Sequence, residues 1–523
     1  MPFPILILYS FSVLGSGIGF VSQSLIAGFW VTTYSNDVFY FSLSTAFYFL
    51  SLGVGSLLSN RWKKPTPSLL LWLTITLSLL AGYSIPVLKL CIQRLGNVFP
   101  LALFWVCLMG IVAGQLIPLT LRVGRNYPTL SLSKLFFCDY LAAIGFTLSF
   151  TLLLLIPNGY GLTSFYLGTF GVFACVVLAA RGRLVSVHLL GVIAASYVLY
   201  LQIPKATLPL EGNAKILHEE QSHYQKIVLT EEAEGNYFFP GIRKHTLYLD
   251  GFVQFSSISE QNYHACLVNV PLAAAEFGGH PVRTVLILGG GDGLAARNLL
   301  AVPKIKRIVQ VEIDPAMIRL AQGEAKVRMY NLDSLRSPKV EIKIEDAFTW
   351  VRTAKEKFDL LVVDFPAPKN LTLSRLFTAE FYSQLTRLVN PEGMISIQAG
   401  PSFSTEDSTL DTLSKVTTCI KRTLVSIGKA AEVYVNSRDN EAFVLVPMSA
   451  GFNSSAFFKK AGMYGGQKEV AHLCVHSPDW KEPSVRVNTL NTLTLSTYML
   501  SWFQTVGGEF FKYRDGHAIF LPN

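Results

Sequence analysis

The first 205 residues contain few acids: only Asp37 and Asp139 carry a carboxylate. The same stretch holds eleven lysines and arginines and therefore the whole net charge of +9, while residues 206–523 are neutral. The basic residues lie in short connections between apolar runs, as membrane topology favours, and not in one patch. This distribution argues against a nucleic-acid partner, although the isoelectric point is near 9.0.

Two other features are missing. The seven cysteines are scattered and form no Cys-x-x-Cys pair, so we expect neither a disulfide framework nor a zinc site, and no metal. The N-terminal Met-Pro-Phe-Pro lacks the basic region of a cleaved signal peptide, and many apolar runs follow it. The first apolar run is therefore interpreted as part of a membrane domain.

Long apolar runs are abundant: half of the residues are hydrophobic and the mean hydropathy is +0.39. A helix needs about 20 apolar residues to cross the hydrocarbon. Seven runs meet this length, at about residues 5–32, 38–58, 68–90, 98–120, 135–157, 160–180 and 185–203. The sequence therefore predicts an α-helical transmembrane bundle over residues 1–205, in the lipid bilayer of the cell (inner) membrane.

The basic connections at residues 61–64, 122–125 and 181–183 follow the second, fourth and sixth runs, so they lie on one side. The positive-inside rule places that side, and the N-terminus, in the cytoplasm. Seven crossings would then put residues 206–523 outside. A cytosolic metabolite is the ligand inferred below, so we favour a cytoplasmic catalytic half; an outward-facing half is the alternative.

Asp139 is the one acid inside an apolar run, where a carboxylate is costly unless it faces a cavity or a partner. One interpretation is a cation-binding or proton-linked site. The other is a helix-end residue near Lys134 at the membrane interface.

The second half has a different pattern. Short alternating strands over residues 215–257 predict a small antiparallel β domain, which with its entry helix spans residues 206–280. Strands that alternate with helices predict an α/β domain with a mostly parallel, doubly wound sheet over residues 281–448, including one strand at 340–348. Residues 449–523 are left as a C-terminal extension.

A glycine turn, Gly289-Gly290-Gly291, lies between an aliphatic strand at 284–288 and a helix that starts near residue 295. Such a turn presents backbone N–H groups and a helix N-terminus to a ligand. Glu312 ends the next strand, about twenty residues on, where a carboxylate can accept both hydroxyls of a ribose. The pattern predicts a nucleotide site.

Four carboxylates, Asp292, Glu312, Asp346 and Asp364, fall at predicted strand ends. The ligand of a doubly wound sheet lies beyond the carboxyl ends of its strands, so these acids suggest a cationic ligand. The alternative is that each one only caps a helix.

These segments resemble the spermidine synthase family of aminopropyltransferases, over about residues 221–446. The resemblance rests on 248–255, Tyr263-His264, 289–293, 312–314, Asp346-Ala347 and 376–382. The apolar runs and residues 485–492 are similar to the membrane-anchored bacterial branch of that family. The resemblance implies a small β domain, a methyltransferase-like Rossmann domain and a homodimer.

The resemblance also implies roles for individual residues. The donor nucleoside would be bound by Gln225, Gln254, Gly289, Gly290, Gly291, Glu312, Asp346 and Ala347. Asp292 would pair with the aminopropyl ammonium, which favours decarboxylated S-adenosylmethionine as cosubstrate. Asp364 would be the catalytic base, and Tyr263 and His264 would contact the acceptor amine together with Asp292.

The chain departs from the family on the acceptor side. Ala367 replaces the second acid of the loop after Asp364, and Ala265 replaces the Glu after Tyr-His. The leading hypothesis is a membrane-bound aminopropyltransferase that makes spermidine and methylthioadenosine from a polyamine such as putrescine. The alternatives are a polyamine- or nucleoside-binding transport or sensor protein with a degenerate synthase domain, and an S-adenosylmethionine-dependent methyltransferase.

Overall fold

The computed structural model describes residues 3–181 and 214–505, apart from residues 35–36, 96–98, 126, 128–129, 151–152, 154, 234–242, 251, 369, 402–410, 437–440, 462–473 and 477–483. The chain divides into two compact units, with residues 1–211 in the first and 212–510 in the second.

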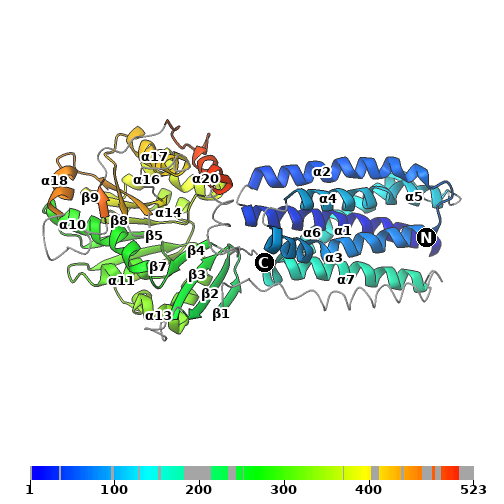
Figure 1. The fold of residues 1–523 in the computed structure, drawn as a ribbon, viewed down its shortest axis with the longest axis horizontal. Coiled ribbons are helices and arrows are strands. Elements are labelled where there is room, and N and C mark those ends of the chain that lie inside the picture. The colour runs from blue at the N-terminus through cyan, green and yellow to red at the C-terminus, as the bar shows by residue number, and fades with distance from the viewer. Residues whose placement is uncertain are drawn as a thin grey trace. The chain divides into compact units, whose positions relative to one another are not determined.

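The first unit is helical (Figure 1). Its helices are α1 (Phe3–Tyr34), α2 (Asp37–Leu58), α3 (Pro67–Leu95), α4 (Phe99–Gly114), α5 (Leu116–Val123), α6 (Leu132–Phe150) and α7 (Ile156–Arg181). Six segments of the described residues are long and apolar enough to cross a membrane, and they match the first six predicted runs. The seventh run, 185–203, and the start of the second unit's linker lie outside the described residues.

Close helix contacts and one basic residue organise this unit. A Cβ atom on Gly168 of α7 would lie 2.5 Å from the Cα of Gly82 on α3, so the two glycines allow the helices to touch. Arg122 donates to the backbone carbonyls of Ser59 and Trp62, the latter at 3.2 Å. The connections after the second and fourth spans therefore lie on the same side, as the charge pattern predicted.

The second unit begins with a four-stranded antiparallel sheet, as predicted. Its strands follow chain order: β1 (Lys215–Gln221), β2 (Lys226–Ala233), β3 (Arg243–Leu249) and β4 (Phe252–Ser256). A short helix, α9 (Glu260–His264), a π turn at Ala265–Asn269 and α10 (Val270–Phe277) lead to the larger sheet. Cys266 in the π turn is disulfide-bonded, which the scattered cysteines had not indicated.

The larger sheet has the order β12-β10-β11-β9-β8-β5-β6-β7. Its strands are β5 (Thr284–Gly289), β6 (Arg307–Glu312), β7 (Val340–Ile344), β8 (Phe358–Asp364), β9 (Val389–Pro401), β10 (Glu432–Asn436), β11 (Glu441–Pro447) and β12 (Cys474–His476). The strands from β9 to β7 pair in parallel, and β11, β10 and β12 add antiparallel pairs at one edge. The mostly parallel sheet is confirmed.

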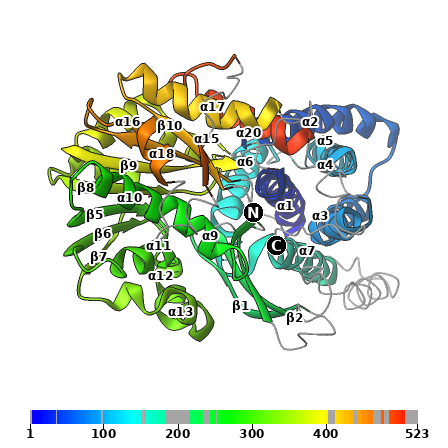
Figure 2. The same cartoon turned by 60° about the vertical axis from the view of Figure 1, so that its left-hand side comes forward.

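Helices cover both faces of this sheet (Figure 2). On β5, Val285 and Ile287 pack on the face of α10, α11 (Leu294–Leu300), α12 (Pro315–Gly323) and α13 (Ala325–Asn331). Leu286 and Leu288 pack on the opposite face, with α14 (Ala347–Thr353), α16 (Ala379–Thr386) and α17 (Asp411–Ser426). Because side chains alternate along a strand, a fully aliphatic strand is what a sheet covered on both faces requires.

One strand prediction was too long. The predicted strand at 340–348 ends at Ile344, and Ala347 begins α14. The Asp346 carboxylate accepts a hydrogen bond from the Phe348 N–H at 3.0 Å and so caps the helix. The apolar alternation continued past the point where this cap turns the chain.

The C-terminal region adds α18 (Ser454–Ala461), β12 and α20 (Thr494–Thr505) to the second unit. β12 pairs with β10, and the Asn488 amide donates to the carbonyl of Ser374 at 2.9 Å. The described C-terminal residues therefore pack on the larger sheet.

Candidate functional site

The glycine turn lies against the end of β8. Gly289, Gly290 and Gly293 have φ angles of +82°, +62° and +82°, which favour glycine. A Cβ atom on Gly289 would lie 2.2 Å from the carbonyl oxygen of Asp364, and one on Gly290 would lie 3.1 Å from its carboxylate. The turn therefore needs glycine both for its backbone angles and for its closeness to Asp364.

Glu312 lies on the other side of the same turn. A Cβ atom on Gly291 would lie 2.8 Å from its carboxylate. That carboxylate accepts a hydrogen bond from the Asp314 N–H at 2.9 Å, which fixes its direction. The structure thus brings together the glycine turn, Glu312 and Asp364, as the sequence predicted from their strand ends.

Gln225 reaches this region from the small sheet. Its amide donates to the Asp314 carboxylate at 3.1 Å, and the Ser222 hydroxyl donates to the same carboxylate at 2.6 Å. Asp314 is fully buried and also accepts from the Ala316 N–H at the start of α12. The turn between β1 and β2 is therefore held beside the end of β6.

Three carboxyl groups around the turn are buried, and burial disfavours their charged forms. It raises the pKa of Glu312 to about 7, with the charges of Asp314 and Asp292 adding to the effect. It raises the pKa of Asp364 to about 6, partly offset by the charge of His264. The pKa of Asp292 is raised for the same reasons. A cationic ligand would favour the charged form of all three.

Tyr263 and His264 extend the site along α9. The Tyr263 hydroxyl donates to the Asp364 carboxylate at 2.6 Å, and burial with the nearby carboxylates raises the pKa of Tyr263 well above its usual value. His264 is buried, and its Nδ1 lies 2.7 Å from the carbonyl oxygen of Glu260. Its Nε2 has no hydrogen-bond partner among the described residues. The predicted acceptor-side residues therefore do lie beside the predicted base.

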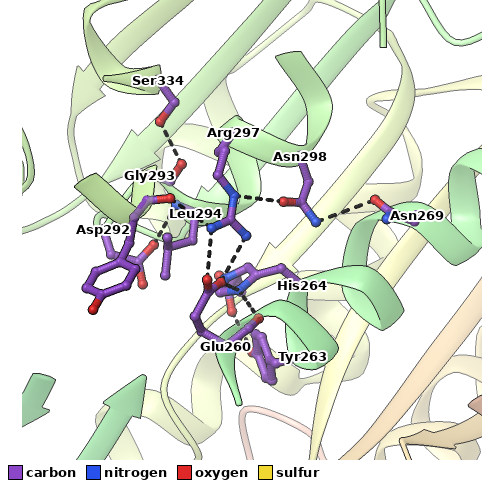
Figure 3. A network of polar contacts seen from close by, with 12 residues as sticks. Glu260, Tyr263, His264, Asn269, Asp292, Gly293, Leu294, Arg297, Asn298 and Ser334 are labelled. Carbon is purple, nitrogen blue, oxygen red and sulfur yellow. Dashed lines mark hydrogen bonds and ion pairs between the residues drawn. The ribbon is translucent and has the colours of Figure 1, made fainter. Parts of the chain in front are cut away.

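A buried ion pair supports this helix (Figure 3). Arg297 on α11 donates to both carboxylate oxygens of Glu260, each at 2.9 Å, and to the carbonyl oxygen of Tyr330 at 2.8 Å. Burial opposes the charge on Glu260, but the hydrogen bonds and charges of His264 and Arg297 leave its pKa below the usual value. The pair fixes α9 relative to the helix that follows the glycine turn.

Asp346 contacts a different set of residues from those around the glycine turn. Its carboxylate accepts from Arg375 at 2.9 Å as well as capping α14, and Arg375 also lies 5.1 Å from the Phe348 ring. Ala347, the first residue of α14, is buried. Gln254 is half-buried on β4. Their expected contacts with an adenine base stay predictions.

The capping alternative is correct for part of the set. Asp346 caps α14, and the Asp292 carboxylate accepts from the Leu294 N–H at 2.9 Å at the start of α11. Asp364 bonds to a tyrosine instead, and Glu312 bonds to the N–H of Asp314. Capping therefore accounts for Asp346. The N-cap of α11 is Gly293, one residue after Asp292, and the expected ligand contacts of Asp292, Glu312 and Asp364 stay predictions.

Sequence reasoning missed several residues of this site. They are Ser222, Glu260, Arg297, Gln310, Asp314 and Arg375. Gln310 donates to the carbonyl oxygen of Gly289 at 3.2 Å, and its place as the one polar residue in the interior of β6, between Ile308 and Val311, could have indicated it. Asp314 precedes Pro315 in a helix-start pattern that was also available. The ion pair between Glu260 and Arg297 could not be predicted from local sequence, because the two residues are 37 positions apart.

Asp139 belongs to the helical unit. It is buried in the middle of α6 and accepts from the hydroxyls of Ser12 and Ser16 on α1, the first at 3.1 Å. The interpretation as an interfacial helix-end residue does not fit this position. Its function stays a prediction. Among the described residues, no group of three or more His, Cys, Asp or Glu side chains could hold a metal ion.

The parallel strand order, the glycine turn after β5 and the acid that ends β6 define the second unit as a Rossmann-like α/β domain of the class that binds nucleosides. Residues 260–429 match the spermine/spermidine synthase domain. The chain is 31% identical to polyamine aminopropyltransferase 1 of Streptomyces coelicolor, over 70% of this chain and 71% of the relative. The chain therefore belongs to the polyamine aminopropyltransferase family of transferases.

Two further relatives match over more of the chain, and a solved structure matches over less of it. The polyamine aminopropyltransferase of Leptospira interrogans is 28% identical over 88% of this chain and 91% of its own. Polyamine aminopropyltransferase 2 of Ralstonia nicotianae is 29% identical over 94% of this chain and 97% of its own. A spermidine synthase solved with the transition state analogue AdoDATO has 19% identity and a TM-score of 0.38, over 56% of this chain and 88% of its own.

Proposed function

We propose that the protein transfers the aminopropyl group of decarboxylated S-adenosylmethionine to a polyamine such as putrescine, giving spermidine and methylthioadenosine. The observation that carries this proposal is the burial of Asp292, Glu312 and Asp364 around one glycine turn. Burial raises their pKa values, a nearby cation would stabilise their charged forms, and both the sulfonium donor and the amine acceptor are cationic.

In the reaction, the lone pair of the acceptor nitrogen attacks the methylene group beside the sulfonium. The carbon–sulfur bond breaks, and neutral methylthioadenosine leaves. Asp364 takes the proton of the attacking amine, since a protonated amine is not a nucleophile. A pKa of about 6 suits a base that works near neutral pH. The remaining work is to hold two cations close together, for which the surrounding carboxylates are suited.

The donor would occupy the glycine turn, with its ribose hydroxyls on Glu312 and its aminopropyl ammonium on Asp292. Asp346, Ala347, Gln225 and Gln254 would contact the nucleoside. In this structure Oδ2 of Asp346 accepts from Arg375 and Oδ1 accepts from the Phe348 N–H, so the adenine amino group would share one of these oxygens with its present donor. Tyr263 and His264 would face the acceptor.

For the whole chain, we propose a multi-pass protein of the cell membrane with a cytoplasmic catalytic half, acting as a homodimer by analogy with the family. Six candidate spans return the chain to the side on which it started. The proposal requires that residues 185–203 do not cross the membrane.

A second candidate is a membrane transport or sensor protein whose synthase domain binds ligand without turnover. Burial of Asp139 inside the helical unit and the loss of an acid at Ala367 favour it. Incubation of the purified protein with the decarboxylated donor and a panel of amines tests both. The proposal expects methylthioadenosine and an aminopropylated amine. Binding of methylthioadenosine without any release from the donor would support the sensor.

A further inference from the structure

The loop after the predicted base, Asp364, contains no charged side chain that could bind an acceptor amine. Residues 365–368 read Phe-Pro-Ala-Pro, and Ala367 packs against the apolar core below α16 and α17. An ammonium group beside Asp364 would therefore find no second carboxylate in this loop. A desolvated ammonium is costly without a partner, so another element must supply one.

Strand register identifies the neighbouring side chains. Val363 of β8 pairs with Ile397 of β9, which places Asp364 level with Gln398. Gln398 in turn pairs with Phe443 of β11, and Glu441 pairs with Pro401. β11 runs antiparallel to β9, so its first residue, Glu441, lies at the same edge of the sheet as the last residue of β8.

Gln398 is a buried acceptor. Its side chain is 8% exposed, and its Oε1 has no hydrogen-bond partner among the described residues. A buried amide oxygen without a donor costs free energy comparable to a lost hydrogen bond. An ammonium group, with three donors and no acceptor, is a suitable ligand for such an oxygen.

Glu441 lies near Tyr263 and Asp364. The ring of Phe443, two residues along β11, lies 5.4 Å from the ring of Tyr263, whose hydroxyl donates to Asp364. The charge of Glu441, after burial and the charge of Asp364, contributes to the raised pKa of Tyr263. The Glu441 carboxylate therefore lies close enough to interact electrostatically with groups at the expected acceptor site.

We propose that Glu441 and Gln398 bind the second ammonium group of a diamine or polyamine acceptor, in place of the acid missing at Ala367. This proposal rests on the proposed function. β8 and β11 are two strand spacings apart, about 10 Å. A chain with one amine at Asp364 and another several methylene groups away can reach toward β11, whereas a monoamine has no second ammonium group to offer Glu441.

The test is calorimetric binding of putrescine to protein loaded with methylthioadenosine, which needs no turnover. Glu441→Gln should weaken putrescine binding by about tenfold to a hundredfold, the range for hydrogen bonds to charged groups. Affinity for methylthioadenosine should be unchanged. Glu432→Gln is the matched control, because Glu432 opposes Leu445 at the other end of the same hairpin.

Equal putrescine affinity in Glu441→Gln and wild type would overturn the inference, whether or not the wild type turns over. If Glu441→Gln also fails to bind methylthioadenosine because it has misfolded, the inference is tested on the wild-type protein instead. Wild-type protein loaded with methylthioadenosine should then bind putrescine about tenfold or more tightly than butylamine, which lacks the second ammonium group. Equal binding of the two amines would contradict the inference. Absence of turnover with normal binding would count against the proposed function only.

Discussion

At the scale of single residues, the site depends on what burial does to carboxyl groups. Asp292, Glu312 and Asp364 all have raised pKa values because water is excluded around the glycine turn. Each is a weaker acid in the empty protein than it would be beside a cation. Ligand binding and charge on these groups should therefore favour one another.

The hydrogen bond from Tyr263 to Asp364 has a predictable effect on pH dependence. It stabilises the charged carboxylate and so lowers the pKa of Asp364, which burial holds at about 6. A base acts only when deprotonated, so kcat/KM should rise with pH through that value. Tyr263→Phe removes the hydrogen bond, and the acidic limb of the profile should move to higher pH. A lower rate with an unmoved limb would mean that Tyr263 only positions the acceptor.

At the scale of secondary-structure elements, α9 is held by the Glu260–Arg297 pair. Both side chains are largely buried, at 1% and 13% exposure. Removal of one partner leaves an uncompensated buried charge, which typically costs about 3–5 kcal/mol.

Arg297→Met alone should therefore lower the urea midpoint of the catalytic unit strongly. The double variant Glu260→Leu/Arg297→Met should recover most of that loss, because an apolar pair of similar size removes both charges. Denaturation followed by the fluorescence of the full chain in detergent measures both. A double variant no more stable than the single one would show that the pair has a role beyond mutual neutralisation.

The elements also show what sequence could and could not predict. The aliphatic pattern of β5 predicts a buried strand and the glycines after it predict a tight turn; both are local signals and both are confirmed, whereas the ligand of the turn stays a prediction. The links of Ser222 and Gln225 with Asp314 were not predicted, because they depend on where the small sheet docks. The position of Glu441 was likewise hidden, since it follows from the order β8-β9-β11 and the antiparallel direction of β11. Periodicity reveals a strand but not its neighbours.

At the scale of the whole molecule, the catalytic unit follows an array of apolar helices in which the basic connections after the second and fourth spans lie on one side. A reporter that is active only outside the cytoplasm should therefore be inactive when fused at residue 212. The same reporter fused at residue 36, between the first two spans, should be active and serves as the control. Activity at both positions would place the catalytic half outside and contradict the proposed use of a cytosolic donor.

The central claim is that Asp364 accepts the proton of an amine that attacks the decarboxylated donor. The most direct measurement is the single-turnover rate of methylthioadenosine release, with putrescine, in wild type and Asp364→Asn. We predict release by the wild type, a rate lowered by about 100-fold or more in the variant, and the same donor affinity in both proteins. Equal rates in the two proteins, or no release by the wild type with any amine, would contradict it.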